Sequence, residues 1–110
     1  MPALRYDLVV DQGSDYARAI PVRDDDDQPV SVAGWSVSGQ IRAGHSAPDA
    51  LVELDLAIAG TSILLRISAA ASTDWTWRLG RYDIELTDPD GAVTRFAEGA
   101  VVVRPQITHL

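Results

Sequence analysis

The chain has 110 residues, enough to bury a hydrophobic core, and we expect one domain over residues 1–110. It has no cysteine, which excludes disulfides, thiolate zinc sites and thiol catalysis. Sixteen acidic residues against nine basic ones give a formal net charge of −7, which argues against nucleic acid and anionic membrane surfaces as partners.

The N-terminal part of the chain predicts two strands that each bury one face. Apolar and polar residues alternate over residues 3–11, and a second strand is predicted over residues 16–22. Pro21 lacks a backbone N–H, so the second strand should lie at a sheet edge or carry a bulge. The residues predicted to share the apolar faces are Leu4, Tyr6, Leu8, Val10, Tyr16, Ile20 and Val22.

Four consecutive aspartates, Asp24 to Asp27, predict an exposed and mobile loop, because like charges repel and the following Gln28-Pro29 favours a turn. The alternative is a calcium site, since carboxylate oxygens are the ligands that calcium prefers. Adjacent aspartates lack the spacing that turns alternate oxygens onto one ion. We therefore expect a solvated loop that binds no ion tightly, and we predict no metal site.

The middle of the chain predicts three more strands and one short helix. Alternation is most regular over residues 35–43, and it returns over residues 51–58, before Gly60 turns the chain into a strand over residues 61–67. Residues 68–74 hold three consecutive alanines and small capping residues, which predicts a helical turn or short helix that crosses between two sheets. The residues predicted to share the apolar faces are Trp35, Val37, Gly39, Ile41, Val52, Leu54, Leu56 and Ile58.

The C-terminal third predicts a β-hairpin. Apolar and polar residues alternate over residues 82–87, Asp88-Pro89-Asp90-Gly91 reverses the chain, and a second strand runs from Val93 to Val103. Tyr82 follows a glycine at the start of a late strand, which is the placement of the tyrosine corner of immunoglobulin-like sandwiches. Pro105 should end the last strand.

Together these elements predict an all-β fold, an antiparallel immunoglobulin-like β-sandwich of about seven to eight strands with one short helical crossover. A small barrel is the alternative architecture. The residues predicted to face the core include Tyr82, Ile84, Leu86, Trp35, Val37 and Ile41.

The templates of catalysis do not fit this sequence. His45 and His109 have no serine or aspartate at a spacing that suggests a triad, and the sequence has no phosphate-cradling glycine loop. Acidic residues fall mostly on the polar faces of strands or in loops, where a solvated surface role is expected. We therefore expect a protein that is not an enzyme and has no cofactor.

Two tryptophans and two aliphatic residues are candidate interface residues. Trp75 and Trp77 are two apart and would point the same way from an extended segment, as a stacking platform for a sugar or a partner. Alternatively, one or both cover the open end of the core. Ile107 and Leu110, in the segment after Pro105, would either contact a neighbouring copy or a partner, or fold back on their own sandwich.

Several short motifs follow one another in a distinctive order over nearly the whole chain. They are Gln12-Gly13-Ser14-Asp15-Tyr16, Gly34-Trp35, Gln40-Ile41-Arg42, Ser68-Ala69-Ala70, Tyr82-Asp83-Ile84-Glu85-Leu86-Thr87-Asp88, Gly91, Val93-Thr94-Arg95, Gly99-Ala100-Val101-Val102-Val103 and Ile107-Thr108. In this order the chain resembles small phage and prophage virion proteins. It is similar to the immunoglobulin-like amino-terminal domains of upper-baseplate proteins that hold receptor-binding fibres.

The resemblance implies a structural protein of the phage tail or baseplate, located in the virion and assembled in the cytoplasm of the bacterial host. Such a protein acts as an adaptor through protein–protein contacts, and anchoring a receptor-binding fibre is one such role. Its partners would be other virion proteins of the tail, baseplate or fibre, in multiple symmetric copies. The alternatives are a carbohydrate-binding module that uses Trp75 and Trp77, and a head decoration or fibre-attachment protein.

Overall fold

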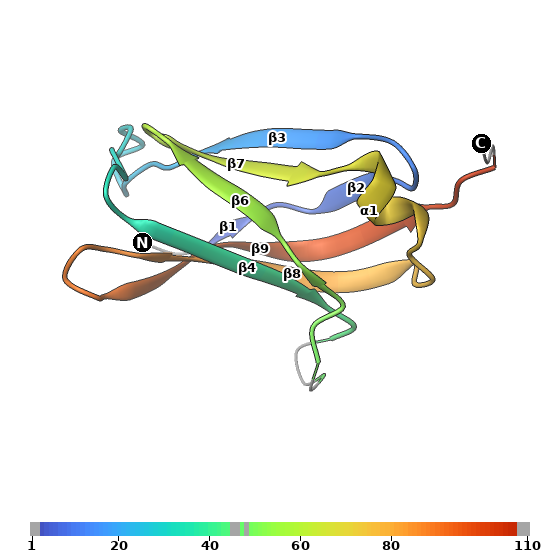
Figure 1. Cartoon of the computed structure of the whole chain (residues 1–110). Helices are drawn as coiled ribbons and strands as arrows, with labels where there is room; N and C mark the ends of the chain where they lie inside the picture. The colour runs from blue at the N-terminus through green and yellow to red at the C-terminus, as the bar shows by residue number, and fades with distance from the viewer. Residues whose placement is uncertain (1–2, 45–46, 48, 108–110) are drawn as a thin grey trace.

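The computed structural model describes residues 3–44, 47 and 49–107, and in this part of the chain two β-sheets pack face to face (Figure 1). Sheet A contains β1 (Leu4–Arg5), β2 (Leu8–Asp11), β4 (Ser36–Arg42), β5 (Val52–Glu53), β8 (Leu79–Thr87) and β9 (Val93–Arg104). Sheet B contains β3 (Tyr16–Pro21), β6 (Asp55–Ala59) and β7 (Ser62–Ile67), and the helix α1 (Ala69–Thr73) connects β7 to β8. The predicted β-sandwich with one short helical crossover is therefore confirmed.

Strand direction departs from the predicted antiparallel arrangement at one edge of sheet A. The order is β1–β9–β8–β4–β5, with β2 also paired to β9, and sheet B runs β3–β7–β6. The pairs are antiparallel except that β1 and β2 run parallel to β9. Alternation reveals which face of a strand is buried but not the direction of its neighbour, so the parallel edge could not be predicted.

Two predicted strands are each split in two, which is why the described residues hold nine strands rather than seven or eight. The first split falls at Tyr6 and Asp7, between β1 and β2. The Tyr6 N–H still donates to the Glu98 carbonyl at 2.9 Å, and the Asp7 carboxylate accepts from the Ala100 N–H at 2.9 Å. Leu4 lies beyond this split and is exposed, although it was predicted to share the buried face.

The second split marks the place where the chain changes sheets. β5 pairs with β4 in sheet A, whereas β6 pairs with β7 in sheet B. Between them the Leu54 N–H donates to the Gly39 carbonyl at 3.0 Å. Alternate residues from Val52 to Ile58 stay partly buried throughout, so the pattern looked like one continuous strand.

The core lies between the two sheets and agrees with the sequence prediction. Ile41, Ile84 and Leu86 are fully buried and Tyr82 is nearly so, while Trp35 and Val37 are partly buried against the same core. Pro21 ends β3, which is an edge strand of sheet B as predicted. The buried hydrophobic residues are Leu8, Val10, Tyr16, Ile20, Val22, Val32, Ile41, Ile63, Leu65, Ile67, Tyr82, Ile84, Leu86, Phe96, Ala97, Val101 and Val103.

The predicted short helix and hairpin turn both form through local hydrogen bonds. The Ser68 side chain accepts from the Ala71 N–H and caps α1. In the β8–β9 turn the Asp88 carboxylate accepts from the N–H groups of Asp90 and Ala92, and Gly91 takes a φ of 89°. A bulge opposite Ile84 and Glu85 lets both Phe96 and Ala97 face inward.

Candidate interaction surface

The outer face of sheet A carries a short row of exposed apolar side chains. The pairing register places Val9 of β2 beside Val102 of β9, and Val102 beside Leu79 of β8. Direct neighbours in a sheet point to the same side, so these three residues, here called the apolar row, are contiguous. Their exposed fractions are 50% for Val9, 41% for Val102 and 65% for Leu79. Such a contiguous group differs from scattered surface hydrophobics and is typical of a contact surface.

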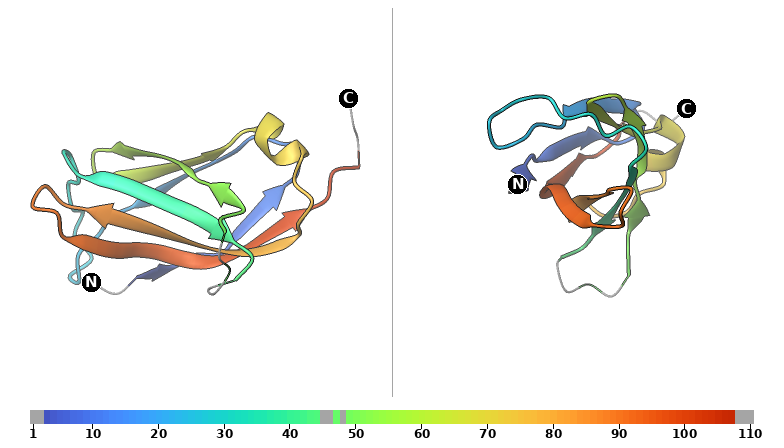
Figure 2. Two further views of the ribbon diagram at one scale, coloured as in Figure 1. Left: turned by 60° about the horizontal axis from the view of Figure 1, so that its bottom comes forward. Right: turned by 90° about the vertical axis from the view of Figure 1, so that its left-hand side faces the viewer.

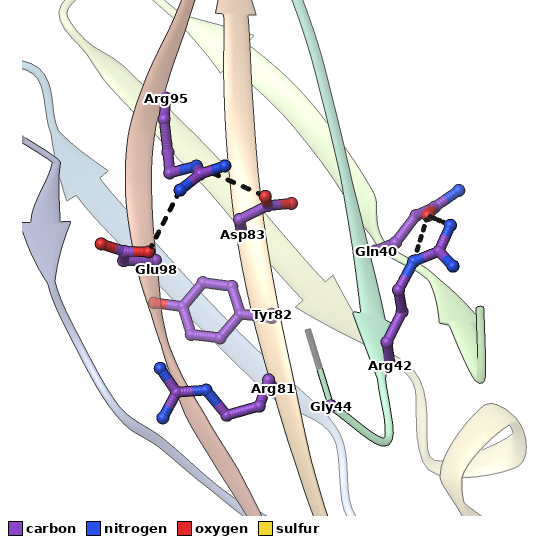
Figure 3. Close-up of a pocket in the computed structure, with 8 residues that line it drawn as sticks. All are labelled: Gln40, Arg42, Gly44, Arg81, Tyr82, Asp83, Arg95 and Glu98. Atoms are coloured by element: carbon purple, nitrogen blue, oxygen red, sulfur yellow. Dashed lines mark hydrogen bonds and ion pairs between the residues drawn. The ribbon is translucent and has the colours of Figure 1, made fainter. Parts of the chain in front are cut away.

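A polar hollow lies on the same face, two residues further along the strands. It measures about 170 Å³ and is lined by Gln40, Arg42, Gly44, Arg81, Tyr82, Asp83, Arg95 and Glu98 (Figure 3). Arg42 and Arg81 are direct partners in the β4–β8 register, an arrangement of like charges that is unfavourable unless the side chains separate. Figure 3 shows that they do, since Arg42 turns to Gln40 while Arg81 points over β9.

The arginines of the hollow differ in how they are paired. Arg95 lies 3.5 Å from the Asp83 carboxylate and 3.6 Å from that of Glu98, and Arg42 donates to Gln40 and to the Ala47 carbonyl. Within the described residues Arg81 makes no ion pair, and its Nε is shielded from solvent without a hydrogen-bond partner. Arg81 is therefore the one guanidinium of the hollow without an ion pair among the described residues, although its charge contributes to the lowered pKa of Asp7.

Beneath this face, the Tyr82 side chain ties sheet A to the N-terminal segment. Its hydroxyl donates to the Tyr6 carbonyl at the break between β1 and β2. This partner differs from that of a tyrosine corner, in which the hydroxyl bonds to the backbone a few residues upstream of the tyrosine. Burial raises the pKa of the Tyr82 phenol, so it stays protonated and keeps donating.

Charged pairs border the apolar row on both sides. Beyond it, Arg104 makes a two-pronged ion pair with Asp11, with an Nη2–Oδ2 distance of 2.8 Å, and this contact lowers the pKa of Asp11. On the side of the hollow, Asp7 pairs with Arg5 at 3.3 Å, and the hydrogen bond from the Ala100 N–H, followed by this pair, lowers the pKa of Asp7. An apolar centre with a charged rim is the usual anatomy of a protein–protein contact.

The structure brings the two predicted tryptophans together. The rings of Trp75 and Trp77 stack with centroids 4.7 Å apart and planes at 26°, and both are partly buried against the core. This arrangement matches the alternative in which they cover the open end of the core. Because the two rings cover each other, they do not form the open double platform considered from the sequence.

The C-terminal segment is fixed at Gln106 and then leaves the sandwich (Figures 1 and 2). The Gln106 N–H donates to the Gln12 side chain at 3.0 Å, and the Thr73 hydroxyl donates to the Gln106 side chain at 2.8 Å. Ile107 follows at once and is 94% exposed. Leu110 lies outside the described residues, as do His45 and His109.

The acidic loop forms a turn in which the side chain of one aspartate accepts hydrogen bonds from the backbone. The Asp24 carboxylate accepts from the N–H groups of Asp26 and Gln28, and Arg23 pairs with Asp27 at 3.3 Å. In the described part of the chain no group of three acidic or histidine side chains is placed to hold a metal ion. Weak ion binding and loop mobility stay predictions. No helix among residues 3–44, 47 and 49–107 has the length and apolarity to cross a membrane.

The sequence model of the LtfC-like, beta-sandwich domain family matches residues 2–104. The chain belongs to this family. No match is found among curated proteins. The LtfC-like family is related to phage tail fibres, so membership supports a phage β-sandwich protein, and it does not extend to the upper-baseplate family that the sequence resembles.

Sequence reasoning missed the apolar row, although the signal was present. Val9 and Val102 occupy outward positions of strands whose buried face is already supplied by Leu8, Val10 and Val101. An apolar residue at an outward-facing position in each of two strands is the signal that could have indicated an exposed apolar surface. That the two positions lie side by side depends on the parallel pairing of β2 with β9, which the sequence does not reveal.

Proposed function

We propose that this LtfC-like domain is a structural component of the phage tail that acts as an adaptor, binding other tail, fibre or baseplate proteins through the outer face of sheet A. The observation that carries the proposal is the apolar row Val9–Val102–Leu79, which is exposed on the outer face of sheet A beside its parallel edge and is bordered by charged pairs. Covering these side chains would contribute about 1 kcal/mol each, because roughly half of each one is already buried.

The surroundings of the row set the chemistry of the partner. Arg81 lies beside it with no ion-pair partner among the described residues, so the partner should present a carboxylate next to its apolar contact. The net charge of −7 disfavours nucleic acid and anionic membrane as alternatives. Virion proteins work as symmetric copies, so the same face would be used repeatedly around the tail axis, and anchoring of a fibre is compatible with this arrangement.

The experiment is to produce virions from a genome that encodes Val102→Asp, and to measure how much of the chain the purified particles carry. We expect the variant to fold, since Val102 is outward-facing, and to be lost from the particles. The matched control is Val93→Asp, because Val93 is 60% exposed on the same strand but lies at the opposite end. Normal incorporation of a folded Val102→Asp chain would contradict the proposed contact surface.

A further inference from the structure

A second hollow lies on a different part of the molecule, where the chain passes from β5 to β6 beside the start of α1. It measures about 210 Å³, close to the size of a single sugar ring. Its lining combines apolar side chains with polar ones of both charges. The lining residues are Val52, Glu53, Leu54, Asp55, Arg66, Ile67, Ser68, Ala71 and Trp75.

Two opposite charges in this hollow do not neutralise each other. Asp55 of β6 and Arg66 of β7 are direct cross-strand partners, a position that favours an ion pair. Yet no ion pair joins them, and neither side chain has a hydrogen-bond partner within the described residues. A carboxylate acceptor and a guanidinium donor thus stand side by side at the exposed rim of the hollow, where both are accessible to a ligand.

The remaining polar groups add to this capacity. The Ser68 oxygen accepts from the Ala71 N–H, which leaves its own O–H free to donate. Glu53 accepts from the Gln40 side chain and has further lone pairs available. The hollow therefore offers both donors and acceptors within a small space.

An aromatic ring supplies the apolar wall. Trp75 lines the hollow, and its stacking on Trp77 covers one of its two faces and holds the ring in place. A pyranose ring has an apolar face of C–H groups that packs on an aromatic ring, and neighbouring hydroxyls that each donate and accept. A fixed tryptophan beside exposed carboxylate and guanidinium groups is complementary to that combination.

We propose that this hollow binds one pyranose residue of a glycan, with Trp75 against the ring and with Asp55 and Arg66 bonding to adjacent hydroxyls. The hollow favours a neutral sugar, since an anionic ligand would meet two carboxylates, at Glu53 and Asp55, against the one guanidinium of Arg66. Trp77 supports Trp75 from behind and does not touch the sugar. Glycan binding here does not depend on the apolar row, which lies on the outer face of sheet A.

The test is saturation-transfer NMR of the full chain with the methyl pyranosides of glucose, galactose, mannose, rhamnose, N-acetylglucosamine and N-acetylgalactosamine. At least one should bind, and in proton–nitrogen spectra of the labelled chain it should shift the indole N–H signal of Trp75 while leaving that of Trp35 unchanged. The double variant Asp55→Asn with Arg66→Gln should weaken that binding by roughly tenfold or more through lost charge-assisted hydrogen bonds. Arg18→Gln, an exposed arginine on β3, is the matched control and should bind as the wild type does.

Two results would overturn the proposal. One is the absence of binding by every glycoside in the panel. The other is binding that leaves the Trp75 indole signal in place, because the sugar would then occupy another site. The Trp75 signal is read from the unmodified chain, so the outcome stands even if the double variant fails to fold. Neither result bears on whether Val102→Asp is lost from virions.

Discussion

At the scale of single residues, the hydroxyl of Tyr82 joins strands from opposite ends of the chain. It donates to the carbonyl of Tyr6, which lies between β1 and β2. Tyr82→Phe removes the donor and leaves this partly buried carbonyl unsatisfied, so we expect a loss of about 1–3 kcal/mol in the free energy of unfolding. Urea denaturation measures it. Tyr16→Phe is the control, because no hydrogen bond of the Tyr16 hydroxyl occurs within the described residues, and an equal loss in both variants would contradict the assigned role.

The carboxylate of Asp7 makes stability depend on pH. Its pKa lies below the ordinary value of 3.8, chiefly because of the hydrogen bond from the Ala100 N–H and also because of Arg5. A carboxyl whose pKa is lowered by folding stabilises the fold above its unfolded pKa, and this contribution disappears as pH falls through the folded value. Melting temperature should therefore fall as pH drops below about 4.

Asp7→Asn should flatten that acid limb of the melting curve, because the side chain can still accept from Ala100 but no longer titrates. The control is Asp90→Asn, whose carboxylate has no hydrogen-bond partner among the described residues. An acid limb of unchanged slope in Asp7→Asn would show that other carboxylates are responsible.

At the scale of elements, a glycine in β9 allows the parallel edge of sheet A to form. A Cβ at Gly99 would lie 2.4 Å from the Tyr6 carbonyl oxygen, which is main chain and cannot turn aside. Gly99→Ala should therefore push the N-terminal segment off β9 and cost about 1–3 kcal/mol. Hydrogen exchange of the β2 amides, together with the unfolding free energy, measures this. Gly44→Ala is a matched control, since a Cβ there meets no atom within 4 Å, and equal stability of the two variants would refute the explanation.

The elements also show why sequence reasoning succeeded in most places and failed in two. The hairpin of β8 and β9, the cap of α1 by Ser68 and the edge strand that ends at Pro21 all depend on local chemistry, which the sequence carries directly. The crossing of the chain at Leu54 and the parallel pairing of β2 depend on contacts between distant segments. Apolar and polar residues alternate in the same way whichever sheet a strand joins and whichever direction its neighbour runs, so this pattern predicts neither feature.

At the scale of the whole molecule, the sequence predicts only some of the residues of the candidate surfaces. Trp75 and Ile107 stood out as large apolar residues outside the regular strands, and the structure places Trp75 on a hollow and leaves Ile107 exposed. Asp55 and Arg66 looked like ordinary polar-face residues. They line the same hollow as Trp75 because the chain changes sheets between β5 and β6 and passes beside α1 at that point.

The measurement that tests the central claim most directly is quantitative mass spectrometry of purified virions, separated into head and tail fractions. The account predicts that this chain is present in the tail fraction, in several copies per particle, as expected for a symmetric tail component. Its absence from purified particles, when infected cells contain it in abundance, would contradict a structural role in the virion. Its presence in the head fraction alone would contradict the assignment to the tail.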